Sequence, residues 1–210
     1  MMTNTKSSPG NNPNDPINFN FSIFFKEVLS PALLLTLICG VSALLLSLTN
    51  YFTESKILEQ NQLFLNSSFK EILPAAASFE VLPVSDFILE ENSVYKAVSS
   101  DNSVVGYVFI NTTAGYKEDV KVMTGLDMSA NITGVRVLEQ NETPGLGQQV
   151  LNKSFIDQYK KGDGNLTHFS VVKALPTQNQ ISAITGATIS SKAVTDCVNS
   201  ALDIYSRLIS

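Results

Sequence analysis

The sequence predicts an α+β protein in which a single N-terminal transmembrane helix is followed by a domain with a curved antiparallel sheet flanked by helices. Three observations lead to this fold class. Residues 28–52 contain no charged side chain and consist mainly of Leu, Ile, Val and Ala. Short β-like runs separated by turns occupy the middle of the chain, and an amphipathic helical pattern closes it.

The N-terminal quarter has two parts of opposite character. Residues 1–27 predict a disordered tail, because up to residue 20 they are rich in Asn, Pro, Ser and Thr with few apolar side chains. Residues 28–52 exceed the ~20 apolar residues that span a bilayer core. A cleaved signal peptide is the alternative, but the long polar leader and the lack of a small-residue cleavage site favour an uncleaved anchor.

The part that follows is expected to fold outside the membrane. Residues 53–75 predict a stalk helix or linker that Pro74 ends, because proline cannot continue a helix. Residues 76–210 then form the predicted folded domain. Its expected elements are strands at 94–98, 104–111, 120–126 and 132–138, a hairpin connection at 127–133, a short helix at 151–160 and a strand at 169–174.

Composition excludes several classes of function. The net charge of −5 argues against nucleic acid as a partner, because nucleic-acid-binding domains are usually strongly basic. Two cysteines without a CxxC pair give no disulfide framework and no zinc or iron–sulfur signature, so no metal site is predicted. His168 is the only histidine, and no recognisable nucleophile lies near it. The chain is therefore expected to have no independent catalytic site.

The last helix begins beside a turn of small residues. Its apolar positions recur at helical spacing: Ala193, Val194, Cys197, Val198, Ala201, Leu202, Tyr205, Leu208 and Ile209. Ser190 or Ser191 is the expected N-cap. Unpaired N–H groups and the helix dipole then point toward Thr188 and favour an anion there, while Gly186 and Ala187 keep side-chain bulk away.

The turn also carries a recognisable motif. Thr185-Gly186-Ala187-Thr188 resembles the flavinylation motif Ser/Thr-Gly-Ala-Thr found in the FMN-binding subunits of two bacterial respiratory complexes. These are the G subunit of the Rnf electron-transport complex and the C subunit of the sodium-translocating NADH:quinone reductase. In that family the last Thr carries FMN through a phosphoester bond. The resemblance therefore implies covalent FMN on Thr188, with Thr185 donating a hydrogen bond near the phosphate.

A second segment extends the resemblance. Residues 142–147 read Glu-Thr-Pro-Gly-Leu-Gly, the core of the family's second signature, and the paired strands before it also match. This loop is expected to border the flavin. The residues implied in cofactor binding are Thr185, Gly186, Ala187, Thr188, Ser190, Glu142, Thr143, Gly145 and Leu146. Leu146 would give apolar contact, and Glu142 would either face the flavin or orient the loop. Lys192 is expected to be solvated, with pairing to the phosphate as the alternative.

Two positions depart from the family pattern. Ser182 stands where an Asp usually precedes the tetrapeptide, and Gln140 stands where a His is often seen before the second signature. The second change removes a titratable group but keeps hydrogen-bonding capacity. Neither change alters the acceptor hydroxyl of Thr188.

The resemblance implies a membrane-anchored, covalently flavinylated electron-transfer protein, most like the G subunit of the Rnf complex, which passes electrons between ferredoxin and NAD while moving ions. Its implied partners are the other membrane subunits of that complex, the flavin transferase that matures it, and the membrane. It would lie in the bacterial cytoplasmic membrane with its C-terminal domain outside the cytoplasm. The C subunit of the NADH:quinone reductase and a cofactor-free scaffold module are the alternatives.

Overall fold

The computed structural model describes residues 29–83, 92–162 and 165–209. By its contacts the chain divides into two units, residues 1–58 and 59–210. The long helix α2, Ser30–Ile72, begins in the first unit and ends in the second. The predicted tail at 1–27 and the first residue of the predicted membrane segment lie outside the described residues.

The described part of the first unit consists mainly of the apolar part of α2. Its large aliphatic side chains are exposed, among them Leu33, Leu35 and Leu46. Within the described ranges, α2 is the one helix that is long and apolar enough to cross a membrane, judged by length and composition. The helix ends two residues before Pro74.

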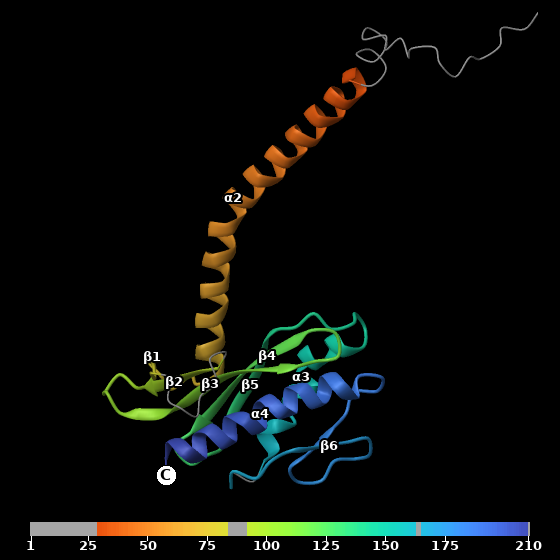
Figure 1. Ribbon diagram of the computed structural model, residues 1–210. Helices are drawn as coiled ribbons and strands as arrows, with labels where there is room; N and C mark the ends of the chain where they lie inside the picture. The colour runs from red at the N-terminus through yellow and green to blue at the C-terminus, as the bar shows by residue number, and fades with distance from the viewer. Residues whose placement is uncertain (1–28, 84–91, 163–164, 210) are drawn as a thin grey trace, which may run out of the picture. The chain divides into compact units, whose positions relative to one another are not determined.

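The second unit is built on a five-stranded antiparallel sheet with the strand order β1-β2-β3-β4-β5 (Figure 1). The strands are β1 Ser78–Val81, β2 Ser93–Val98, β3 Val104–Ala114, β4 Asp119–Asp127 and β5 Ile132–Glu139. This sheet and its covering helices confirm the predicted α+β class. Four strands fall where the sequence places them, and β1 is an additional edge strand that pairs with β2.

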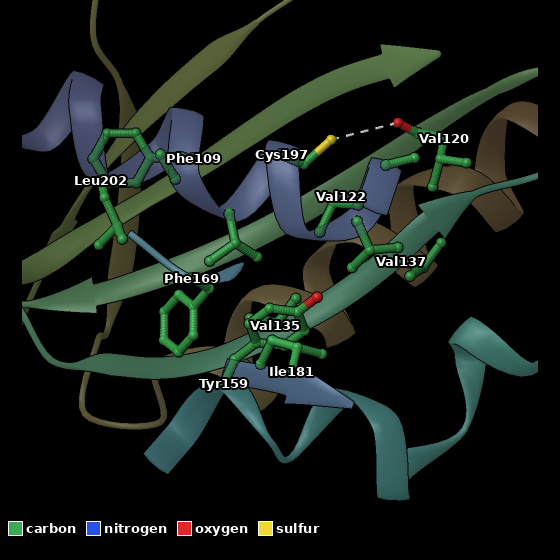
Figure 2. Close-up of a cluster of buried hydrophobic side chains, with 14 of the residues drawn as sticks. Phe109, Val120, Val122, Val135, Val137, Tyr159, Phe169, Ile181, Cys197 and Leu202 are labelled. Carbon is green, nitrogen blue, oxygen red and sulfur yellow. Dashed lines mark hydrogen bonds between the residues drawn. The ribbon is translucent and has the colours of Figure 1, made fainter. Parts of the chain in front are cut away.

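Helix α4, Thr188–Leu208, covers one face of the sheet and forms the main core with it. Figure 2 shows side chains of β3, β4 and β5 meeting Cys197 and Leu202 of α4, with Ile181 and Tyr159 closing the cluster. The Cys197 thiol lies 3.7 Å from the carbonyl oxygen of Val120, and burial raises its pKa to about 11. Cys197 is therefore an unreactive part of the core.

The last turns of α2 cover the opposite face. Phe69, Ile72 and Leu73 pack on Val108 and Met123, which point away from α4. Alternation along β3 separates the two cores, because Val108 and Ile110 belong to this cluster whereas Phe109 belongs to the other.

The segment between β5 and α4 differs from the prediction in two ways. The single helix expected at 151–160 is replaced by three short pieces, η2 Gly147–Leu151, α3 Lys153–Ile156 and η3 Tyr159–Lys161. Asn152 separates the first two, because its backbone is extended at φ −67° and ψ 135°. The strand expected at 169–174 is shorter, β6 Ser170–Val172, and pairs in parallel with β7 Gln180–Ser182.

Candidate functional site

Helix α4 starts earlier than the predicted caps, at Thr188. The N-cap is Ala187, whose side chain makes no capping hydrogen bond, so the prediction that Ser190 or Ser191 caps the helix is wrong. The hydroxyl of Ser191 instead accepts from the N–H of Ile184 at 3.0 Å and donates to the carbonyl of Ala187 at 2.9 Å. These bonds fix the preceding turn against the helix.

Ser190 is hydrogen-bonded to the second signature segment, residues 142–147. Its buried hydroxyl donates to Glu142 Oε2 at 2.6 Å, across 48 positions of sequence. Glu142 Oε1 accepts from the backbone N–H groups of Tyr116 at 2.8 Å and Lys117 at 3.2 Å. Glu142 therefore joins the β3–β4 turn, its own loop and the first turn of α4.

Glu142 is only 4% exposed, yet its carboxyl group is held in the ionised form. Burial raises the pKa of this carboxyl group. The hydrogen bonds from Ser190 and from the N–H groups of Lys117 and Tyr116 lower the pKa by more than burial raises it, so the pKa lies below its ordinary value. A negative charge is therefore fixed beneath the start of α4.

Two glycines make room for this carboxylate. A Cβ on Gly147 would lie 2.7 Å from Glu142 Oε2 and 2.7 Å from the Ser190 hydroxyl oxygen, and a Cβ on Gly115 would collide with Glu142 Oε1. Only glycine therefore fits at either position without displacing the bridge. Neither requirement is visible in the sequence, because it depends on contacts between distant segments.

A cavity of about 760 Å³ opens beside this bridge. Its walls include eight of the nine residues predicted for cofactor binding: Thr185, Gly186, Ala187, Thr188, Ser190, Glu142, Thr143 and Leu146. Gly145 has a left-handed backbone, φ +76°, and is not on the wall. The loop approaches the motif closely at Gly186, because a Cβ added to this glycine would lie only 3.2 Å from Leu146 Cδ2. The cavity is within the usual size range for a small-molecule or cofactor site.

The start of α4 offers donors to this cavity. Among the described residues, no hydrogen bond uses the N–H groups of Thr188, Ile189 or Ser190. Such groups at a helix N-terminus suit an anion such as a phosphoryl group. The donor set and the cavity size therefore fit FMN.

Six wall residues are not among the predicted cofactor-binding residues: Tyr116, Gly147, Lys173, Ala183, Ile184 and Ile189. Two of these six carry titratable groups. Tyr116 and Lys173 both line the wall, whereas Lys192 is exposed and does not. Lys173 reaches the motif because the carbonyl of Val172, at the end of β6, accepts from the N–H of Ala183 at 2.7 Å. Lys173, the residue that follows β6, therefore lies beside the turn that leads to α4. The parallel pairing of two three-residue strands gives no periodic signal from which this could be predicted.

The chain resembles known proteins along most of its length. Residues 22–72 match the RnfG N-terminal region and residues 115–203 match the FMN-binding domain. The G subunit of the Na(+)-translocating ferredoxin:NAD(+) oxidoreductase complex of Acetobacterium woodii is 38% identical over 202 residues, covering 89% of this chain and 95% of that protein. The G subunit of the ion-translocating oxidoreductase complex of Methanosarcina acetivorans is 35% identical, covering 86% of this chain and 96% of its own.

One solved structure is more distantly similar. The C subunit of the Na(+)-translocating NADH-quinone reductase from Parabacteroides distasonis has a TM-score of 0.49 and 19% sequence identity, covering 69% of this chain and 92% of that chain.

Proposed function

The chain belongs to the G-subunit family of ion-translocating oxidoreductase complexes, and we propose that it is a membrane-anchored electron-transfer protein that carries FMN covalently on Thr188. The family assignment follows from relatives at 38% and 35% identity over most of the chain. The match of residues 115–203 to the FMN-binding domain supports FMN as the cofactor. The geometry of the site supports attachment to Thr188.

One observation favours Thr188 as the acceptor: its hydroxyl is available to react, whereas the serine hydroxyls at the start of α4 are not. Those of Ser190 and Ser191 are buried and already make hydrogen bonds. Thr185 is exposed and lies before the helix, whereas Thr188 is half-buried and is the first helical residue. Among the described residues, no hydrogen bond occupies the Thr188 hydroxyl, and the adjacent N–H groups can receive a phosphoryl group.

The chain's own residues would hold the cofactor. The N–H groups of Thr188, Ile189 and Ser190 would bind the phosphoryl oxygens, and Leu146 would give apolar contact to the ring. Glu142 would orient the loop rather than bind the flavin directly, because both of its oxygens already accept hydrogen bonds. The bound flavin supplies electron transfer, and the protein supplies position and electrostatics.

The family and helix α2 support the proposed cellular setting. Helix α2 would cross the bacterial cytoplasmic membrane as an uncleaved anchor, and the folded domain would lie outside the cytoplasm. The protein would work with the other membrane subunits of a redox-driven, ion-translocating complex and contribute no separate catalytic site. A covalent tether suits this position, because a dissociable cofactor would be lost by dilution, whereas a tether fixes its effective concentration.

Co-expression of the full chain with a flavin transferase tests the proposal. After denaturation, the wild type should show flavin fluorescence on a gel and the mass of one added FMN less one water. Thr188→Ala should lose both signals, while Thr188→Ser keeps a hydroxyl at the same place and should regain part of the adduct. An unmodified wild type would indicate a cofactor-free module, and an adduct on the Thr188→Ala protein would move the acceptor elsewhere.

A further inference from the structure

Three titratable side chains face the cavity: Tyr116 from the β3–β4 turn, Glu142 from the loop after β5, and Lys173 from the segment after β6. The first turn of α4 contributes hydroxyl and aliphatic side chains but no titratable one. Within the described part of the wall, Lys173 is therefore the one cation and Glu142 the one carboxylate.

The two charges differ in how they are held. Glu142 is buried and makes hydrogen bonds that join three segments, so its position is fixed. Lys173 is exposed and, among the described residues, takes part in no ion pair with a carboxylate. Its four-carbon side chain can move its charge within the cavity.

A phosphoryl group on Thr188 would already have partners in the N–H groups at the start of α4. The other place where a bound flavin gains negative charge is the ring, because a reduced flavin becomes an anion when it loses its N1 proton. We propose that Lys173 pairs with the negative charge of the reduced flavin ring and so raises the reduction potential of the cofactor. This inference rests on the proposed function.

The physical reason is the difference that a cation makes between the two redox states. The oxidised ring is neutral, whereas the deprotonated reduced ring is an anion, so a nearby ammonium stabilises only the reduced form. An opposite charge within about 4–6 Å lowers the pKa of an acid by about one unit or more. The effect is stronger in a cavity than in bulk water, because the effective dielectric constant is lower.

The experiment uses the full chain in detergent, loaded with covalent FMN, and begins by checking the added mass in each variant. The reduction potential of the attached flavin is then measured by spectroelectrochemistry over a pH series. Lys173→Gln removes the charge, and Lys173→Arg keeps it. Lys192→Gln removes the same charge from an exposed position outside the cavity wall and serves as the matched control.

We expect Lys173→Gln to lower the potential at alkaline pH. The bend in its plot of potential against pH, which marks loss of the N1 proton, should move to higher pH by about one unit. Lys173→Arg and Lys192→Gln should follow the wild type.

Three outcomes would overturn the inference. In the first, loaded Lys173→Gln titrates as the wild type does. In the second, Lys192→Gln shifts the potential equally, which would indicate a general charge effect. In the third, Lys173→Gln attaches less FMN but its loaded fraction keeps the wild-type potential, which would place Lys173 at the phosphoryl group. A wild type without added mass would instead contradict the proposed function.

Discussion

The two ends of helix α4 do different work. From Ala193 to Tyr205 its buried side chains rest on the sheet and form the main core. Its first three residues, 188–190, line a cavity, and among the described residues no hydrogen bond uses their N–H groups. The change occurs within one helical turn. One helix therefore supports the fold and carries the site, and substitutions at its two ends should affect different properties.

The largest expected effect on stability lies in the apolar part of α4. Leu202 is 3% exposed, and Leu202→Ala should cost about 2–5 kcal/mol, because it removes buried methyl groups and leaves a cavity. The measurement is urea unfolding of the full chain in detergent. Ile189→Ala is the matched control in the first turn, where the side chain is 52% exposed, and should change stability by less than about 0.5 kcal/mol. Equal losses of stability in the two variants would contradict the view that the two ends of α4 have different roles.

The next effect lies where the first turn meets the loop. Gly147→Ala places a Cβ against Glu142 and the Ser190 hydroxyl, and should cost about 2 kcal/mol, as overpacking does. It should also slow flavin attachment, because the cavity wall must shift. Urea unfolding and a time course of the added mass measure the two effects. A protein with wild-type stability and attachment would show that the close approach of Gly147 is unimportant.

A smaller effect is expected from the Glu142 charge. Glu142→Gln should cost about 1.5 kcal/mol at neutral pH, because it weakens hydrogen bonds to a charged acceptor. The pKa of Glu142 is lowered in the fold, so its contribution is present above the ordinary pKa and is lost as the pH falls through the lowered one. The stability gap between variant and wild type, measured by urea unfolding over a pH series, should therefore close on acidification.

Glu139→Gln is the control for this pH dependence. Its carboxylate is 69% exposed and pairs with Lys121 at 3.2 Å, so its removal should matter little at any pH. A gap for Glu142→Gln that stays constant across the pH series would refute the charged role of Glu142.

The smallest effect is expected at Ser191. Ser191→Ala removes the acceptor for the N–H of Ile184 and should cost about 1 kcal/mol by urea unfolding. Ser206→Ala, near the other end of α4, removes a half-buried hydroxyl that donates to the carbonyl oxygen of Asp203 in the same helix at 2.8 Å, and should cost less than Ser191→Ala. If Ser206→Ala costs as much as Ser191→Ala, the hydroxyl of Ser191 has no special part in fixing the turn.

The sequence predicts the framework well because its elements have local signals. Alternation of apolar and polar residues predicts strands β2 to β5, and apolar residues at helical spacing predict α4. The family predicted from the two signature segments is also confirmed by the relatives. These features need only short-range patterns and turn residues.

What sequence reasoning missed depends on contacts between distant segments. The two serines were predicted as helix caps, but the Ser190 hydroxyl donates to Glu142, 48 positions away, and the helix begins at Thr188. The Ser191 hydroxyl accepts from the N–H of Ile184 in the preceding turn. Lys173 reaches the cavity only because β6 pairs with β7 in parallel. Short strands of three residues carry too little pattern to reveal such pairing.

Peptide mapping of the flavin-loaded full chain tests the central claim most directly. Trypsin cuts after Lys173 and Lys192, so one peptide, residues 174–192, contains Thr185, Thr188, Ser190 and Ser191 together. Fragmentation of that peptide should place the whole FMN adduct on Thr188. An adduct on Thr185 or on either serine, or none on this peptide, would contradict the account.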